Sequence, residues 1–361
     1  MKALLVSEYG ALNGGEFSFL TALPYIQDAG FEFSAALPPE SDFAALLQKQ
    51  GVRIEPFSFH DSDGIRKPQS DIRTELAGLI ERIKPDIVHA NSLAASRILG
   101  PVTAEMQTVR LGYLRDIIKL SRKAIEDVGM LDQIVAVSQA TADFHAARGM
   151  PQHKLEVIHN GVDLDRFRRP TSATQSKVCL CIGQIGMRKG LDLSLNVLTK
   201  AFQQVPDAEL WIVGERHSQK QEAIEHEQQL RAFADQNFAK GSVKWLGRRN
   251  DIPDLMSKAR ILVHAARQEP LGRVLLESAA SGLPIVTTNV GGTPEILAGL
   301  DDLMYDPESF DDALPKIVAL LTDDRLHGEV SQSLRRIAEQ KFTAKRAGED
   351  LARCYQSLLL Q

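Results

Sequence analysis

The sequence predicts an α/β protein built from two doubly wound, Rossmann-like domains. The chain has 361 residues, which is long for one ordinary domain and suits two. In both halves, short apolar runs alternate with longer amphipathic segments, a pattern typical of parallel sheets covered by helices on both faces. A polar, proline-containing stretch at 165–176 lies near the middle of the chain and is the expected linker.

The first half, residues 1–167, is expected to form the first domain. Its apolar runs predict β-strands, and the amphipathic segments between them predict α-helices. Strands are expected at 3–6, 33–37, 87–89, 108–114, 134–137 and 156–158. Helices are expected at 17–28, 43–50 and 74–83.

The second half, residues 168–342, repeats the same alternation. A further helix should begin after Gly272 and end at Gly282 and Pro284, which stop helices. The last segment, 344–360, carries apolar residues at helical spacing and must pack against something. Strands are expected at 178–182, 209–213, 243–246, 261–265 and 284–287, and helices at 191–204, 253–257 and within 215–240.

Composition places the chain among ordinary globular proteins. The apolar fraction is 43%, the charged fraction is 25% and the formal net charge is −5. Residues 1–167 hold 17 basic and 22 acidic side chains and the remainder 25 of each, so we expect no nucleic-acid partner. With no membrane-length apolar run and an N-terminus that starts as a strand, we expect a cytoplasmic protein.

The segment 269–277 is the most informative motif. Glu269 and Glu277 bracket a Pro-Gly turn and the start of a helix, whose free N–H groups favour a phosphate. Helical side chains tilt toward the N-terminus, so Glu277 can reach back to that point. A carboxylate beside a phosphate must face hydroxyls or an amine, which suits a sugar nucleotide. The alternative is that acidic residues simply favour helix N-termini.

Two loops in the second half carry cations after predicted strands. Gly183 begins a loop that ends in Arg188 and Lys189, ahead of a helix, and this arrangement can hold a diphosphate. Arg248 follows another strand, where a loop would form the wall beside a base. Ordinary surface loops with solvated charges remain the alternative for both.

In the first half, candidate residues follow three strands. Gly14 and Gly15 open a helix after the first strand, as phosphate loops do. His89 ends a later strand next to Asn91; it is either a donor to a sugar hydroxyl or a structural histidine. Arg115 follows the next strand and either serves a site or simply pairs with Asp116. We see no convincing metal-ligand spacing, so a metal-free reaction is favoured.

Taken together, these motifs resemble the family-4 retaining glycosyltransferases of the GT-B fold. The resemblance covers nearly the whole chain in the family's order and is most specific between 269 and 295. It runs through 14–16, 86–89, 137–138, 159–163, 183–190, Gly214, Gly247, 269–277 and 291–295.

The resemblance implies a metal-independent transfer of a sugar from a nucleoside-diphosphate sugar to a hydroxyl acceptor. The transferred sugar is expected to be a hexosyl group. The resemblance also implies that the second domain binds the donor, that the first binds the acceptor, and that a helix at about 343–361 packs back onto the first. The implied catalytic residues are Glu269, Arg188, Lys189 and His89. The implied donor-binding residues are Gly14, Gly15, Gly183, Arg248, Leu271, Gly272, Arg273, Val274 and Glu277.

Two positions depart from the family pattern. Gln184 stands where many members have arginine, and Arg188 is the expected substitute. Arg115 stands where many members have a histidine that contacts the donor sugar. We assign Arg115 and Asn91 to the acceptor side, because a guanidinium suits an anionic acceptor or a phosphate. The alternatives are another GT-B enzyme, such as an epimerase, or a catalytically degenerate protein that only binds sugar nucleotides.

The acceptor class stays open between a glycan, a lipid-linked molecule and a small molecule, within polysaccharide or glycoconjugate biosynthesis. Basic residues from Arg110 to Lys123 surround Ile117, Ile118 and Leu120, a pattern that suits contact with an anionic membrane surface. Acidic neighbours interrupt this patch, so the sequence favours a solvated helix face over membrane contact. No cofactor is expected.

Overall fold

The structure is a computed structural model that describes residues 1–102, 108–168 and 176–360. The chain divides into two compact units, each of which is a doubly wound α/β domain, as predicted. Unit 1 comprises Met1–Gly161 and Ala344–Gln361, and unit 2 comprises Val162–Thr343. The units therefore divide slightly before the predicted position at 167. Residues 169–175 of the predicted linker lie outside the described residues.

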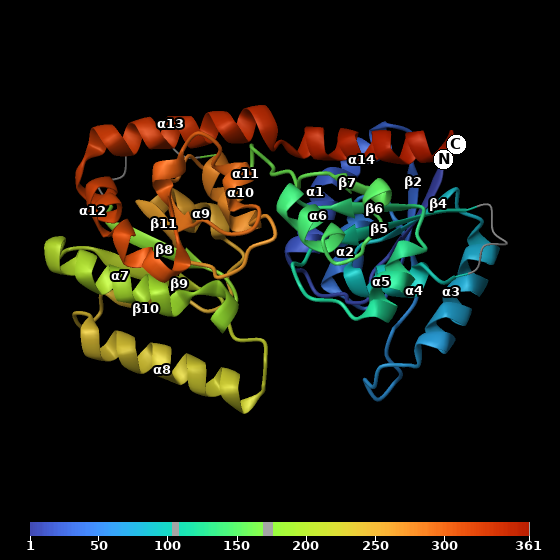
Figure 1. The fold of residues 1–361 in the computed structure, drawn as a ribbon, viewed down its shortest axis with the longest axis horizontal. Helices are drawn as coiled ribbons and strands as arrows, with labels where there is room; N and C mark the ends of the chain where they lie inside the picture. The colour runs from blue at the N-terminus through green and yellow to red at the C-terminus, as the bar shows by residue number, and fades with distance from the viewer. Residues whose placement is uncertain (103–107, 169–175, 361) are drawn as a thin grey trace. The chain divides into compact units, whose positions relative to one another are not determined.

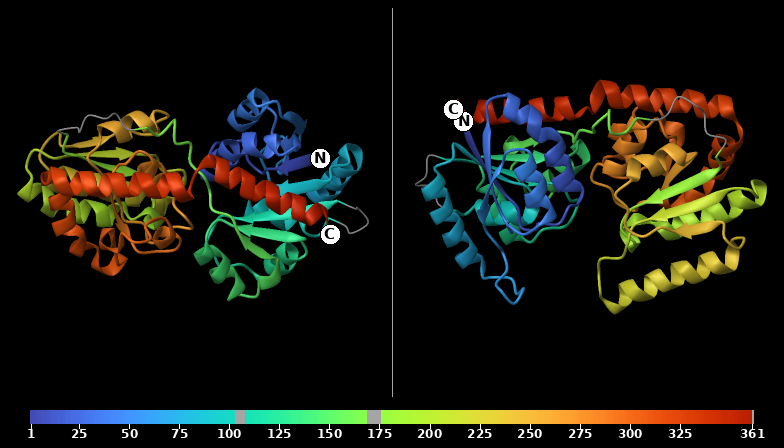
Figure 2. Two further views of the ribbon diagram at one scale, coloured as in Figure 1. Left: turned by 90° about the horizontal axis from the view of Figure 1, so that it is seen from above. Right: turned by 180° about the vertical axis from the view of Figure 1, so that it is seen from behind.

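Unit 1 is built on a parallel sheet with the strand order β3-β2-β1-β4-β5-β6-β7. β1 lies between β2 and β4, and helices flank the sheet (Figure 1, Figure 2). The strands are β1 (Lys2–Val6), β2 (Glu32–Leu37), β3 (Arg53–Pro56), β4 (Ile87–Ala90), β5 (Val109–Leu114), β6 (Gln133–Ala136) and β7 (Leu155–Val157). The helices are α1 (Gly14–Asp28), α2 (Asp42–Lys49), α3 (Gln69–Ile83), α4 (Leu93–Leu99), α5 (Arg122–Gly129), α6 (Gln139–Ala146) and α14 (Ala344–Leu359), with the short turn η1 (Gln152–Lys154).

Serine residues cap the N-termini of several helices of unit 1. The hydroxyl oxygen of Ser92 accepts the N–H of Ala95 at 3.2 Å, and that of Ser138 accepts the N–H of Thr141 at 3.0 Å. Ser41 and Ser121 cap α2 and α5 in the same way. Each cap satisfies one of the N–H groups that the first turn leaves without a partner. These caps fix where each helix starts, just after a strand or its loop.

Unit 2 is built on a second parallel sheet, with the strand order β10-β9-β8-β11-β12-β13. Its helices flank this sheet as in unit 1 (Figure 2). The strands are β8 (Val178–Ile182), β9 (Glu209–Val213), β10 (Val243–Trp245), β11 (Ile261–His264), β12 (Ile285–Thr288) and β13 (Met304–Tyr305). The helices are α7 (Leu191–Gln204), α8 (Gln221–Asn237), α9 (Ile252–Lys258), α10 (Arg273–Ala280), α11 (Thr293–Ile296), α12 (Leu314–Thr322) and α13 (Asp324–Lys341), with the turns η2 (Met187–Lys189), η3 (Asp301–Leu303) and η4 (Pro307–Ala313).

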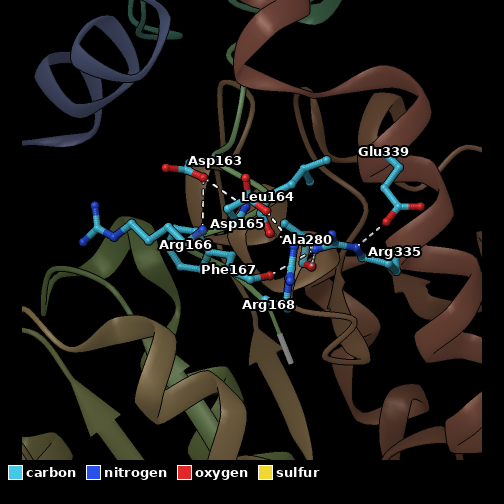
Figure 3. Close-up of polar contacts among 9 residues, drawn as sticks. All are labelled: Asp163, Leu164, Asp165, Arg166, Phe167, Arg168, Ala280, Arg335 and Glu339. Carbon is cyan, nitrogen blue, oxygen red and sulfur yellow. Dashed lines mark hydrogen bonds and ion pairs between the residues drawn. The ribbon is translucent and has the colours of Figure 1, made fainter. Parts of the chain in front are cut away.

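Arg335 of α13 fixes the chain where unit 2 begins (Figure 3). Its Nη1 donates to the carbonyl oxygens of Leu164 at 3.3 Å, Phe167 at 3.1 Å and Ala280, and its Nε donates to Glu339 at 2.7 Å. One guanidinium thus satisfies carbonyl groups from two separate segments. The first turn of unit 2 is thereby held against the end of α10.

Helix α14 packs beside α1 in unit 1. Tyr355 is fully buried, and the centroid of its ring lies 5.2 Å from that of Phe31 in an edge-to-face arrangement. The helices approach closely at Gly348. A Cβ atom on Gly348 would lie 2.6 Å from both the carbonyl oxygen of Ala22 and the Cβ of Tyr25.

This close approach gives a test of the α1–α14 packing. Gly348→Ala should lower the free energy of unfolding by about 1–3 kcal/mol, because the added methyl group overpacks the interface. Gly328→Ala is the matched control, since a Cβ there meets nothing within 4 Å. The control should raise stability by about 0.5–1 kcal/mol through helix propensity. Denaturant titration measures both, and a stabilised Gly348→Ala variant would contradict the packing.

The prediction missed β3 and β13. β3 alternates charged residues with Ile54 and ends in Pro56, and β13 has two residues. Both are edge strands, where a strand pairs on one side and needs little apolar sequence. Their pairing depends on the neighbouring strand rather than on their own pattern.

Candidate functional site

The candidate donor site lies at the carboxyl edge of the unit 2 sheet, where ligands bind in doubly wound folds. The loops there are tied by backbone hydrogen bonds. The N–H of Gly183 donates to the carbonyl of Val213 at 2.9 Å, and the N–H of Gly292 donates to the carbonyl of Glu269 at 3.0 Å. A third bond, from the N–H of Arg267 to the carbonyl of Arg188 at 2.8 Å, joins the loop after β11 to the loop after β8, so these loops are connected within unit 2.

Glu269 and Lys189 are in direct contact. Nζ of Lys189 lies 2.5 Å from Oε2 of Glu269, and Nε2 of His264 lies 2.9 Å from the same oxygen. Glu269 is 5% exposed and His264 is 4% exposed. This contact joins the cationic loop after β8 to the loop after β11, so the two most informative sequence motifs form one cluster.

The charges of this cluster are fixed by their surroundings. Burial by itself raises the pKa of a carboxyl, but the Lys189 charge and the His264 hydrogen bond outweigh it and lower the pKa of Glu269 to about 2. Burial lowers the pKa of His264 against the opposing effect of Glu269, and the charges of Lys189 and Arg188 lower it further. At neutral pH the site holds an ionised carboxylate, and a neutral imidazole that donates to it.

Arg267 holds the turn η2 in place. Its backbone N–H donates to the carbonyl of Arg188 at 2.8 Å, and its Nη1 donates to the carbonyl of Met187 at 3.0 Å. The same guanidinium forms a two-pronged ion pair with Asp192, at 2.8 and 2.6 Å. The side chain of Arg188 is exposed. The turn therefore presents one solvent-facing cation, Arg188, beside the carboxylate-bound Lys189.

Gly190 allows the loop to approach β11. It has a φ of +61°, and a Cβ there would lie 1.8 Å from the carbonyl oxygen of Ala265. Any other residue would clash with that backbone. A small cavity under the loop is lined by residues that include Gly183, Lys189 and His264.

The helix α10 begins where the sequence predicted. Gly272 is its N-cap, with a φ of +99°, and Leu271 before it is buried. Glu277 accepts a hydrogen bond from Nε of Arg273 at 2.6 Å, so its side chain reaches back by one turn, as expected. Val274 lies half-buried in the same first turn. The first N–H groups of a helix lack partners within it, so this end suits an anion.

The predicted base-side residue, Arg248, is exposed on the loop after β10. Its backbone N–H donates to Oε1 of Glu215 at 3.2 Å. This contact links the loop after β10 to the loop after β9. The side chain itself faces solvent, which leaves its binding role a prediction.

In unit 1, Gly14 and Gly15 form the first turn of α1. Asn13 and Glu16 make a capping box there, in which the N–H of Asn13 donates to Oε2 of Glu16 at 3.0 Å. A Cβ on Gly15 would lie 3.0 Å from Cδ of Arg115. The glycine turn and Arg115 are therefore in contact.

Arg115 bonds to two asparagines rather than to Asp116. Its Nε and Nη2 donate to the backbone and side-chain oxygens of Asn91, both at 3.0 Å, and its Nη1 donates to Oδ1 of Asn160 at 3.1 Å. The guanidinium carbon lies 3.9 Å from the centre of the Tyr113 ring. Arg115 thus ties together the loops after β4, β5 and β7, and Gly15, Asn91 and Arg115 form one cluster.

His89 lies in the core of unit 1, which favours the structural histidine over the implied catalytic role. Its side chain has no exposed surface, it stacks on Tyr113 at 5.4 Å between ring centres, and its Nδ1 contacts the hydroxyl of Tyr355. Burial and the charge of Arg115 hold the pKa of His89 well below its usual range. All residues of β4 are buried, so the strand pattern gave no sign of which way the ring points.

Two residues of the donor cluster were missed from the sequence, His264 and Arg267. His264 was counted as part of an apolar strand, although a polar residue at the carboxyl end of such a strand is itself a signal. An arginine in a polar loop is common and gives no signal of its own. The role of Arg267 depends on backbone carbonyls of another loop, which no sequence pattern reveals.

No group of three or more histidine, cysteine and acidic side chains within 1–102, 108–168 and 176–360 is arranged to hold a metal ion. None of the helices in those ranges has both the length and the apolar character that crossing a bilayer requires. In the patch proposed for a membrane surface, Arg110 pairs with Asp132 and Lys123 pairs with Asp127. Ile117 is buried and Leu120 is half-buried, whereas Ile118 is 45% exposed, so the patch keeps one exposed apolar side chain.

Comparison with known sequences identifies the family. The sequence profile described as "Glycosyltransferase Family 4" matches residues 12–166, and that of "Glycosyl transferases group 1" matches residues 164–341. The lipopolysaccharide core biosynthesis glycosyltransferase LpsE of Rhizobium meliloti is 25% identical over 322 residues, covering 86% of this chain and 87% of LpsE. Spore coat protein SA of Bacillus subtilis is 27% identical over 62% of this chain and 64% of its own length. For the first four curated relatives, the matches span only 51–65% of the relative's length.

Solved structures agree with this assignment at the level of the fold. Alr3699/HepE of Anabaena, solved with UDP and glucose, superposes with a TM-score of 0.84 at 20% identity, covering 99% of this chain and all of that one. A glycosyltransferase from Rickettsia africae gives a TM-score of 0.81 at 17% identity over 99% and 98% of the two chains. The fold is therefore GT-B, and because the two family profiles together match residues 12–341, the chain belongs to the family-4 glycosyltransferases.

Proposed function

We propose that the protein is a retaining glycosyltransferase that moves a sugar from a nucleoside-diphosphate sugar to a hydroxyl acceptor without a metal ion. The observation that carries this proposal is the Glu269–Lys189 contact, in which a buried carboxylate and a cation share one edge of the unit 2 sheet. The contact joins the two motifs that the family-4 resemblance assigns to the donor sugar and the diphosphate.

The charges and helix geometry of unit 2 support donor binding. Arg188 and the N-terminus of α10 would hold the diphosphate, and Glu277 would hold ribose hydroxyls. Glu269, ionised at neutral pH, would accept hydrogen bonds from the donor sugar. HepE has been solved with UDP-glucose, and a relative from Corynebacterium glutamicum is described as GDP-mannose-dependent. Both use or bind a sugar nucleotide, which supports a donor of this class here.

The chemistry follows from where charge develops. Breaking the bond at the anomeric carbon places positive charge on the sugar and negative charge on the leaving diphosphate. Arg188, Lys189 and the first N–H groups of α10 would stabilise the diphosphate. Glu269 is already ion-paired with Lys189, which favours hydroxyl binding over nucleophilic attack. We therefore favour attack on the same face, with a leaving phosphate oxygen taking the acceptor proton.

Unit 1 would supply the acceptor side. Arg115 and Asn91 lie beside the glycine turn of α1, and a guanidinium at such a turn suits an acceptor with an anionic group. His89 enters this proposal only as a residue of the core beneath Tyr113.

A cytoplasmic location stays a prediction for cell fractionation to test.

The proposal is tested by nucleoside-diphosphate release. A thermal-shift screen of UDP, GDP, ADP and dTDP with their glucose or mannose esters should raise the melting temperature for one base, because ligand at 100 times its Kd stabilises the fold by about 2.7 kcal/mol. The selected donor is then incubated with candidate acceptors in EDTA. Release should require an acceptor, and NMR of the product should show the donor's anomeric configuration.

Other outcomes separate the competing functions. Conversion of the donor sugar without release of the diphosphate would favour an epimerase. Binding without turnover for any acceptor tested would favour a degenerate binding protein. Loss of turnover in EDTA would overturn the metal-independent part of the proposal, and an inverted product would overturn the retaining part.

A further inference from the structure

Glu269 receives both of its protein hydrogen bonds on one oxygen. Nζ of Lys189 and Nε2 of His264 approach Oε2 at 2.5 and 2.9 Å. Among the described residues, no hydrogen bond to Oε1 of Glu269 is found. An ionised carboxylate has acceptor positions on both oxygens, so Oε1 keeps its capacity to accept from a ligand.

The two donors differ in rigidity. His264 is the last residue of β11; it pairs with Thr287 of β12, and its backbone carbonyl accepts the Thr287 hydroxyl at 2.8 Å. Its side chain is 3% exposed. The Lys189 side chain, by contrast, is 20% exposed on a flexible stem. His264 is therefore the fixed donor, and Lys189 supplies the charge.

The surroundings keep His264 neutral. Burial favours the uncharged ring, and Arg188 and Lys189 add positive charge nearby. A neutral ring gives Glu269 one N–H without placing a further cation beside the carboxylate. The carboxylate keeps its negative charge, and the proposed sugar-binding oxygen keeps its strength as an acceptor.

We infer that His264 is a positioning residue, which holds Oε2 of Glu269 so that Oε1 faces the hydroxyl groups of the donor sugar. The inference rests on the proposed function and extends it to a residue outside the predicted motifs. It requires that loss of the His264 donor weakens recognition of the sugar and leaves recognition of the nucleotide intact.

The test compares three variants at one position. His264→Gln places an amide nitrogen near the position of Nε2 and should keep turnover within about threefold of wild type. His264→Asn has an amide that stops short of Glu269, and His264→Leu has no donor. Both should lower kcat/KM for the sugar nucleotide by about tenfold to hundredfold. Isothermal titration with UDP-glucose and UDP, or with GDP-mannose and GDP if those bind, should show weaker binding of the sugar nucleotide only.

A second readout does not depend on turnover. Carbon-13 NMR of labelled glutamate, assigned by comparison with Glu269→Gln, follows ionisation of Glu269 between pH 3 and 7. The pKa of Glu269 should rise in His264→Asn and His264→Leu and stay low in His264→Gln, since Lys189 alone would then oppose burial.

The outcomes distinguish the inference from the function it rests on. Equal losses in His264→Gln and His264→Leu, an unchanged titration of Glu269 in both donor-free variants, or an equal loss of nucleoside-diphosphate binding would overturn the positioning role. A wild-type protein that releases no nucleoside diphosphate would instead overturn the proposed function, while the Glu269 titration would still decide the role of His264.

Discussion

Glu269→Gln should abolish sugar transfer while the protein still binds nucleoside diphosphate. The amide keeps the shape of the carboxylate but loses its charge, so the hydroxyls of the donor sugar lose a charged acceptor. Turnover should fall by at least about a hundredfold, as when a positioned electrostatic group is removed. Affinity for the nucleoside diphosphate should change by less than about threefold, because the sugar is absent from that ligand.

The same variant should change how stability depends on pH. The pKa of Glu269 falls from a usual 4.5 to about 2 on folding. A lowered carboxyl pKa stabilises the fold above the unfolded value, and this contribution is lost as pH falls from about 4.5 toward 2. Denaturant titrations at pH 7, 4 and 3 should show wild type losing about 2 kcal/mol more than the variant by pH 3. Exposed Glu222→Gln is the matched control and should match wild type in both assays.

Arg188→Ala should lower kcat by about a hundredfold to a thousandfold. Its side chain is exposed, while its backbone is held by Arg267, so the variant removes a charge from a turn that stays in place. Arg188→Lys should recover part of the rate, since a lysine restores the charge without the planar fork. Steady-state kinetics with saturating donor measures kcat.

Arg325→Ala provides the control for a lost surface arginine, because this residue is 81% exposed on α13 and pairs with Glu329. Its kcat should equal that of wild type. If Arg188→Ala also kept wild-type kcat, Arg188 would not stabilise the leaving diphosphate, and it would not replace the arginine that many family members have at the position of Gln184.

The sequence predicted the regular parts of the fold well, and the reasons are local. Residues 191–204 form α7 as expected. Gly190 ends the preceding turn η2, and the apolar residues of 191–204 then recur at helical spacing without interruption. The start of α10 at Gly272 follows from one glycine with a positive φ. Periodicity and glycine or proline signals carry such information within a few residues.

Contacts between distant residues were not predictable in the same way. Arg115 bonds to Asn91 and Asn160, and Glu269 bonds to Lys189, across 24, 45 and 80 residues, separations that no periodic pattern encodes. The resemblance implied a catalytic role for His89, but its side chain is buried in the core of unit 1. A strand buried on both faces gives no alternation to orient a side chain. The family resemblance implied roles for Glu269 and Arg188, but it did not point to His264 and Arg267, which contact them.

The return of α14 to unit 1 has a consequence for synthesis on the ribosome. Unit 1 is discontinuous, since Ala344–Gln361 follow the whole of Val162–Thr343. Until α14 emerges, the surfaces of Phe31 and Phe33 that Tyr355 covers have no partner. The nascent first domain must therefore wait, incompletely folded, while the second is translated, and this interval is when it is most exposed to aggregation and most in need of chaperones.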